Sequence, residues 1–275
     1  MTNAAFPDVV SEPPFDCVRQ RRIGLMLALA IIAGWLCVHI GTVFLFQLRW
    51  DTALFAAGFV LLQTWLSVGL FIVAHDCMHG SLVPGALEAN RWIGRVCLFL
   101  YAGFLFDALN RAHHKHHRFS GTAEDPDFDD HPPYGFWHWF AKFFVTYFSL
   151  VQIAIIGCVY LIYLFAFGVA PLNAVVFWAL PGLLSALQLF TFGTYLPHKP
   201  DGRDFADRHN ARTNALPAWL SLLTCFHFGY HHEHHLYPTV PWWRLPGMRG
   251  KRGAHKLVSS DPHPSPPRKG EGEGR

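Results

Sequence analysis

The stretch ALFAAGFVLLQTWLSVGLFIVAHDCMHG, residues 53–80, combines the two features that decide the fold of this 275-residue chain. Its first part, 53–74, is apolar and exceeds the roughly 20 residues that a helix needs to cross a bilayer. Its end, His75-Asp-Cys-Met-His79, spaces two imidazoles by four residues, so that a helix places them on one face, one turn apart. The stretch therefore predicts a membrane helix that carries a histidine pair at one surface of the bilayer.

The composition extends this interpretation to the whole chain. With 52% hydrophobic and only 15% charged residues, it is too apolar for an ordinary soluble domain. Three further long apolar runs occupy 23–46, 143–167 and 172–196, whereas 96–106 and 218–228 are shorter and suit interfacial helices. We predict an all-α, polytopic membrane protein with four transmembrane helices.

The ends of the chain differ from its centre. We expect a flexible N-terminus over 1–20, one membrane domain over 21–250, and a disordered tail rich in proline, glycine and charge over 251–275. The six cysteines are scattered without a CxxC pair, which predicts reduced thiols and neither a disulfide framework nor a zinc site. A net charge of only +3, without a basic stripe, argues against a nucleic-acid partner.

The positions of lysine and arginine predict an orientation. Only Arg49 lies between the first two apolar runs, and neither residue type lies between the last two. The positive-inside rule then puts both termini and the 75–142 loop in the cytoplasm, across the inner membrane of a bacterium. The histidine-bearing segments all fall on that cytoplasmic side, where we expect a helical cap.

Two more histidine clusters repeat the helical spacing. In His113-His-Lys-His116-His117, the first, fourth and fifth residues share a face, and His114 points away. The third cluster, at 231–235, has the same pattern. Its second member, His232, lies off the shared face, although His232 and His235 are a possible alternative pair. A single histidine, His198, follows the end of the fourth apolar run, 172–196. The inward set is His75, His79, His113, His116, His117, His198, His231, His234 and His235.

So many imidazoles on one side of a membrane predict a metal site, because burying strongly polar rings together is costly without a shared partner. Nine ligands are too many for one ion and suit two, each with open positions for a reactant. Spacing alone does not choose iron over zinc, copper or manganese. Candidate outer residues around the ligands are Asp76, Asp125, Asp127, His227 and Glu233. His227 is also the alternative to His198 as the ninth ligand. His39, His138 and His209 are interpreted as isolated interfacial residues.

The three clusters resemble the histidine boxes of the integral-membrane fatty acid desaturase and hydroxylase superfamily. The flanking segments 64–85, 121–129, 187–200, 207–212 and 221–246 resemble its bacterial carotenoid ketolases, and the resemblance covers about 20–246. It implies that the eight box histidines hold two irons that activate O2. His198 corresponds to an extra histidine of related di-iron membrane enzymes. Oxygen activation itself needs a redox metal, which zinc is not.

The resemblance also implies a reaction: carbon 4 of the ring of β-carotene, or of a hydroxylated carotenoid, becomes a ketone through two hydroxylations and loss of water. The products are of the echinenone, canthaxanthin or astaxanthin type. The substrate is expected to enter from the membrane lipid. Electrons are expected from a separate donor, a ferredoxin with its reductase, because the chain has no GxGxxG, CxxCH or iron–sulphur cysteine pattern.

Three alternatives remain open at this point. A carotenoid ring hydroxylase or a fatty acyl desaturase would share the same boxes and differ only in the shape of the pocket. A non-catalytic membrane metal-binding or transport protein belongs to a different class. A transporter is expected to place its ligands near the middle of the bilayer, and the predicted position at one face disfavours it.

Overall fold

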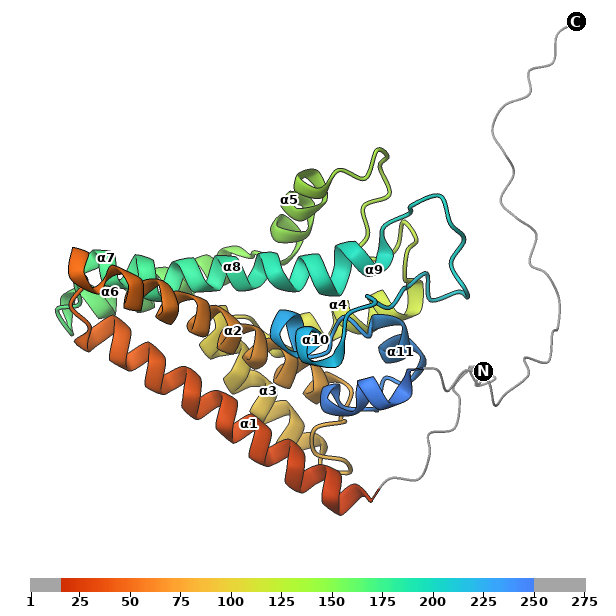
Figure 1. The fold of residues 1–275 in the computed structure, drawn as a ribbon, viewed down its shortest axis with the longest axis horizontal. Coiled ribbons are helices and arrows are strands. Elements are labelled where there is room, and N and C mark those ends of the chain that lie inside the picture. The colour runs from red at the N-terminus through yellow and green to blue at the C-terminus, as the bar shows by residue number, and fades with distance from the viewer. Residues whose placement is uncertain (1–15, 250–275) are drawn as a thin grey trace, which may run out of the picture.

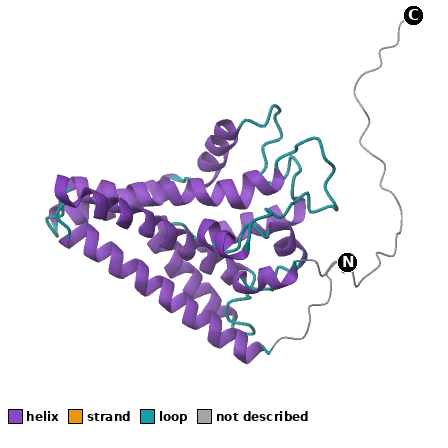
Figure 2. Ribbon diagram, viewed as in Figure 1, coloured by secondary structure: helices purple, strands orange, loops and turns teal. Residues whose placement is uncertain are grey.

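The computed structural model describes residues 16–249, and every regular element in this part of the chain is a helix (Figures 1 and 2). The all-helical class is thereby confirmed. The first helix, α1 (Cys17–Ile40), begins inside the segment 1–20 that the sequence predicts to be flexible, and the Asp16 side chain caps it by accepting from the Val18 N–H at 2.8 Å. Residues 1–15 and the predicted tail 251–275 lie outside the described residues.

Three continuous helical stretches are long and apolar enough to cross a membrane. The first joins α1 to a π-helical turn, Gly41–Leu45, and the second runs from Trp50 through α2 (Ala53–Met78). The third covers Pro171–His198. It consists of the following segments: α7 (Pro171–Ala174), a π-helical turn (Val175–Ala179), α8 (Leu180–Leu189), a second π-helical turn (Phe190–Tyr195) and α9 (Leu196–His198).

The expected span 143–167 is not one straight helix. The structure divides it between α5 (Phe136–Tyr147) and α6 (Leu150–Phe165), which meet at an angle of 82°. Ser149 starts the second helix, because its hydroxyl accepts the N–H of Gln152 at 3.2 Å and so replaces a missing backbone partner. The hydropathy of the run predicts its length. A hydropathy average does not detect a single polar residue, such as Ser149, that caps a new helix.

The short helix expected at 96–106 is also divided. Residues 96–102 end α3 (Leu87–Ala102), and Phe106 begins α4 (Phe106–Phe119) after a turn of 98°. Gly103 makes that turn with φ of 68°, a left-handed conformation that glycine adopts without steric cost. Residues 16–249 thus contain three candidate spans, or up to five if each bent pair counts as one, where four were expected.

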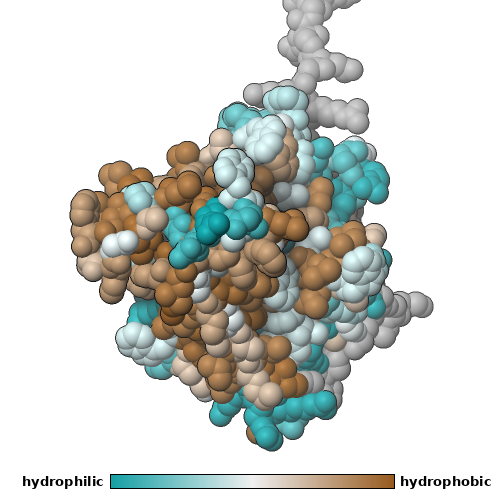
Figure 3. Space-filling view, turned by 60° about the vertical axis from the view of Figure 1, so that its left-hand side comes forward, coloured by the Kyte–Doolittle hydropathy of each residue, from teal (hydrophilic) through white to brown (hydrophobic). Residues whose placement is uncertain are grey.

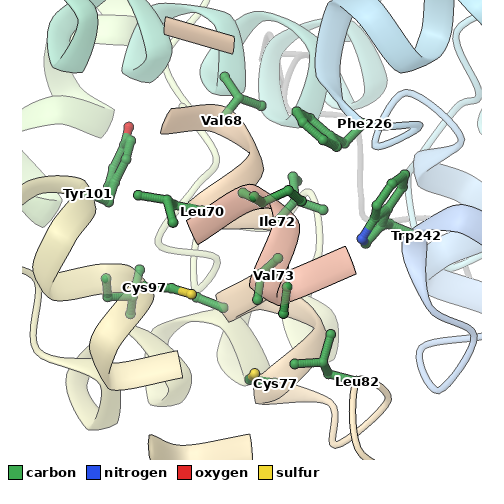
Figure 4. Packing of buried hydrophobic residues seen from close by; sticks show 14 of the residues in the cluster. Val68, Leu70, Ile72, Val73, Cys77, Leu82, Cys97, Tyr101, Phe226 and Trp242 are labelled. Carbon is green, nitrogen blue, oxygen red and sulfur yellow. The ribbon is translucent and has the colours of Figure 1, made fainter. Parts of the chain in front are cut away.

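Helix α2 is the centre of the packing and contacts α1, α3 and α8. Its second half is buried almost all round, so its apolar residues have no single outward face. Figure 4 shows Tyr101 of α3 on one side of this helix, and Phe226 and Trp242 of the C-terminal segment on the other. Gly69 permits the close approach, since a Cβ there would lie 2.8 Å from the Phe226 ring.

The C-terminal segment covers the end of α2. It contains α10 (Ala218–Cys225), α11 (His231–Leu236) and a 3-10 helix (Trp242–Met248). Figure 1 shows α10 beside α2, and α11 toward the end of the bundle opposite the turn that joins α1 to α2. Figure 3 shows hydrophobic residues over most of the face toward the viewer, as expected for helices surrounded by lipid.

Candidate metal centre

The nine predicted ligand residues lie together at one end of the bundle, although four separate parts of the chain supply them. They form two groups, in each of which the candidate ligand atoms lie within 4.8 Å of one another. The larger group is His75, His79, His113, His117 and His234, and the smaller group is His116, His198, His231 and His235. Both clusters of three histidines contribute residues to both groups. The spacing of the histidines along one helix does not predict this division.

The distances between ring nitrogens suit bound metal ions. Metal–imidazole bonds are about 2.1 Å long, so two nitrogens at right angles on one ion lie about 3 Å apart. In the larger group, Nε2 of His234 lies 3.1 Å from Nε2 of His75 and 2.9 Å from that of His117. In the smaller group, Nε2 of His235 lies 3.2 Å from that of His116 and 3.1 Å from that of His231. Both groups fit the geometry of a shared ion.

The hydrogen bonds of His198 leave one nitrogen available. Its Nδ1 lies 2.7 Å from the carbonyl oxygen of Asn210, which only accepts, so Nδ1 carries the hydrogen. The lone pair is then on Nε2, which is buried without a hydrogen-bond partner. The side chain is 1% exposed, so water does not supply that partner, and this nitrogen is a candidate metal ligand.

His116 is oriented by a carboxylate in the same way. Its Nδ1 lies 2.9 Å from Asp125, whose oxygens also accept the backbone N–H groups of Gly121 and Asp127. These bonds and the Nδ1–H of His116 turn the Nε2 of His116 toward the smaller group. Asp127 lies 3.7 Å from the same ring and accepts the hydroxyl of Tyr147, and burial raises the pKa of Asp127 to about 6.

Most ligand imidazoles outside the long helices have lowered pKa values and favour the neutral form. His116 is the exception, because the charges of Asp125 and Asp127 outweigh its burial and raise its pKa. Burial lowers the pKa of His79 to about 3. Burial, followed by the proximity of other imidazoles, holds the pKa values of His231, His234 and His235 well below their usual range. Only the neutral ring offers a lone pair to a metal, so burial keeps these side chains ready to bind one.

The other predicted outer residues occupy different positions. Asp76 accepts the Trp242 N–H at 3.2 Å, and its Oδ1 is 3.8 Å from Nδ1 of His75, beyond hydrogen-bond distance. Glu233 accepts the hydroxyl of Thr213. His227 stacks on Trp242 with 6.1 Å between ring centroids. Asp76 and His227 therefore help to seat the C-terminal segment around the site.

The two off-face histidines have their own partners. Nδ1 of His114 lies 2.9 Å from the Asn110 carbonyl oxygen, and Nε2 of His232 lies 2.7 Å from Asp207. Asp207 is one of several acidic residues close to the clusters in sequence, whereas helical spacing did not predict the Asn210 carbonyl that orients His198. Both belong to an irregular loop, where no helical or strand periodicity predicts which way a side chain points. The available signal was their place in the polar segment 207–212, nine and twelve residues after His198.

An apolar cavity of about 260 Å³ reaches the larger histidine group. His75 and His113 contribute to its wall at one end, with Asp127 and Tyr147 nearby in the lining. Its other walls are mostly aromatic and aliphatic side chains from α2, α3, α5, α6, α8 and the turns beside them, among them Phe71, Tyr101, Phe104, Phe143, Trp178 and Leu189. An apolar cavity with imidazoles in part of its wall suits a lipid-like substrate that binds next to a metal.

Comparison with known proteins identifies relatives over most of the chain. The profile of the family "Fatty acid desaturase" matches residues 51–156 and 147–255. A β-carotene ketolase from a Paracoccus strain is 48% identical over 228 residues, 82% of this chain and 92% of the relative. One from another Paracoccus strain is 47% identical over 232 residues, 84% of this chain and 94% of the relative.

A β-carotene ketolase of Haematococcus lacustris is 36% identical over 260 residues, which cover 84% of this chain and 80% of the relative. The likeness extends beyond the ketolases. A chloroplastic omega-6 fatty acid desaturase of Brassica napus is 25% identical over 242 residues, 70% of this chain and 51% of the relative. This chain belongs to the fatty acid desaturase family, among the relatives of its β-carotene ketolases.

Proposed function

We propose that the chain is a carotenoid ketolase, which oxidises carbon 4 of a carotenoid ring to a ketone. The observation that carries the proposal is the apolar cavity that ends at His75 and His113 in a chain 48% identical to a β-carotene ketolase. A saturated fatty acyl chain would also fill an apolar cavity. The extent and level of the identity to ketolases favour the carotenoid.

The metal in this proposal is iron, one ion in each histidine group. The larger group would hold one ion through five imidazoles and the smaller group the other through four. Two bound irons would supply the redox-active binding site that O2 needs for reaction with a C–H bond, with the electrons provided by an outside donor. The outer partners Asp125 and Asn210 keep two of the ligand rings in the tautomer that binds.

The proposed reaction consists of two successive hydroxylations of the same methylene carbon. Each converts one C–H bond to C–OH, consumes one O2, two electrons and two protons, and releases one water. The resulting geminal diol loses a further water and leaves the ketone. The four electrons come from outside, and we propose a ferredoxin with its reductase as the donor.

The residues of the chain position the ring and keep water out. The aromatic walls would hold an apolar ring, and His75 and His113 mark the end at which the reacting carbon is placed. Asp127 and Tyr147 are the polar groups beside that end, and their shared hydrogen bond holds a proton close to His116. We place the site on the cytoplasmic side of the bacterial inner membrane, with both termini there and with entry of the carotenoid from the bilayer.

Expression of the chain in cells that accumulate β-carotene tests the proposal. Chromatography and mass spectrometry of the pigments are expected to show mono- and diketo carotenoids. A His116→Ala variant, which removes a ring from the smaller group, is the matched negative control. Hydroxylated carotenoids without ketones, or altered fatty acids with unchanged pigments, would contradict the ketolase assignment.

A further inference from the structure

A second cavity of about 220 Å³ adjoins the first. Ile156 and Trp178 belong to the walls of both cavities. Helix α6 passes both, with Gln152 lining the first cavity and Tyr163 lining the second. These two residues are eleven positions apart, which corresponds to about 16 Å along a helix. The two cavities therefore follow one another along the bundle, away from the histidine groups.

The second cavity contains a polar pair in otherwise apolar surroundings. Nε2 of His39, on α1, lies 2.9 Å from the hydroxyl oxygen of Tyr163 on α6. The His39 side chain is 3% exposed and stacks on Trp35, with ring centroids 4.4 Å apart. Polar residues inside a membrane-spanning helix are costly and commonly serve a function. The interpretation of His39 as an isolated interfacial residue is therefore incomplete.

The pair still has capacity for one more ligand, because Nδ1 of His39 is buried without a hydrogen-bond partner. If the tyrosine hydroxyl donates to Nε2, the Nδ1–H remains a free donor and the tyrosine oxygen keeps an acceptor lone pair. If Nε2–H donates instead, the hydroxyl hydrogen is the free donor and Nδ1 the acceptor. In both tautomers the pair keeps one unused donor and one unused acceptor, and both residues line the second cavity.

A carotenoid carries a ring at each end of a stiff polyene, so a substrate with one ring at the histidine groups extends its other ring away from them. We propose that the second cavity holds this distal end and that His39 and Tyr163 bind an oxygen on the distal ring, either ketone or hydroxyl. This inference rests on the proposed ketolase function. Its consequence is that a carotenoid already oxidised at one end is held with its unreacted ring at the metal site.

Kinetics with three carotenoids in membranes from cells expressing the full chain test the proposal. The substrates are β-carotene, its 4-monoketone and its 3,3′-dihydroxy derivative. The His39→Phe variant keeps a flat ring on Trp35 but removes both nitrogens, and Tyr163→Phe removes the hydroxyl. We expect each variant to raise the KM for an oxygenated substrate, relative to the KM for β-carotene, by about fivefold, the effect of one lost hydrogen bond.

Tyr160→Phe is the matched control, because it removes a hydroxyl one turn earlier on α6 from a side chain that packs against a buried cluster containing Val43 and Phe177. The KM ratio is expected to stay as in the unmodified chain. A rise for the monoketone alone identifies the ketone as the bound group, and a rise for the dihydroxy carotenoid alone identifies the hydroxyl.

Two results would overturn the inference: unchanged KM ratios in both variants, or an equal loss of activity on all three substrates, which indicates a purely structural hydrogen bond between α1 and α6. If the unmodified chain oxidises none of the three carotenoids, the proposed function fails instead. The two failures are thus distinguished within one experiment.

Discussion

A histidine that binds a metal through Nε2 needs a partner for its Nδ1–H, and in His116 that partner is Asp125. The Asp125→Asn variant keeps the shape of the side chain but removes its charge. We expect a 10- to 100-fold loss of metal affinity or activity, the usual effect of changing such an outer partner. Iron content per purified chain and ketolase rate measure it.

The control lies in the same loop. Asp130 is exposed and pairs with His131 and Lys142, away from the ligand rings. An Asp130→Asn variant is expected to keep its iron and its activity. Equal effects of the two substitutions would show that the loop, and not the bond to His116, matters for the metal.

The ninth ligand is also decided by single residues. His198 belongs to the smaller histidine group and directs a free nitrogen into the site, whereas His227 stacks on Trp242. We expect His198→Ala to lower the iron content, with loss mainly from the smaller group, and His227→Ala to retain it. Metal analysis of both purified variants gives the answer, and the reverse order of iron contents would make His227 the ligand.

Among the elements, the bend between α3 and α4 depends on a small residue. A Cβ on Gly94 would overlap the ring of Phe106, the buried first residue of α4. We expect Gly94→Ala to destabilise the protein by about 1–3 kcal/mol through overpacking. Thermal unfolding in detergent measures the effect. In Gly157→Ala, where a Cβ meets nothing within 4 Å, stability is expected to stay equal or rise slightly.

Helix positions were predictable to different degrees. The run 53–74 became one continuous helix that is long and apolar enough to cross a membrane, because it contains no charged residue before His75. The run 143–167 became two helices, because Ser149 caps a new one and the chain bends there. Local polar bonds end helices, and a hydropathy average does not detect them.

For the whole molecule, the cavity must stay open if a carotenoid is to reach His75 and His113. Gly182 lines this cavity, and a Cβ there meets nothing within 4 Å. We expect Gly182→Phe to fill the space and lower kcat/KM for β-carotene by about a hundredfold without loss of iron. The control Gly58→Phe adds the same ring on an exposed position of α2. Equal activity of the two variants would contradict the assignment of this cavity to the substrate.

The orientation in the membrane is a prediction for the whole molecule as well. Single cysteines at Gln47 and Asp204, both exposed, can be placed in a cysteine-free chain. A membrane-impermeant thiol reagent added to intact spheroplasts is expected to label position 47, and position 204 only after permeabilisation. Labelling of position 204 from outside would reverse the predicted orientation and put the histidines on the periplasmic face.

The sequence by itself determined the helical class, the histidines that share a face in each cluster, and the presence of enough imidazoles for two metals. Helical periodicity and hydrophobicity are local properties, so they can be read along one segment. Only the tertiary structure decided that His234 joins His75 while His235 joins His116, that Asn210 orients His198, and where the cavities lie. Those contacts join residues up to 159 positions apart, and only the packing of the helices brings them together.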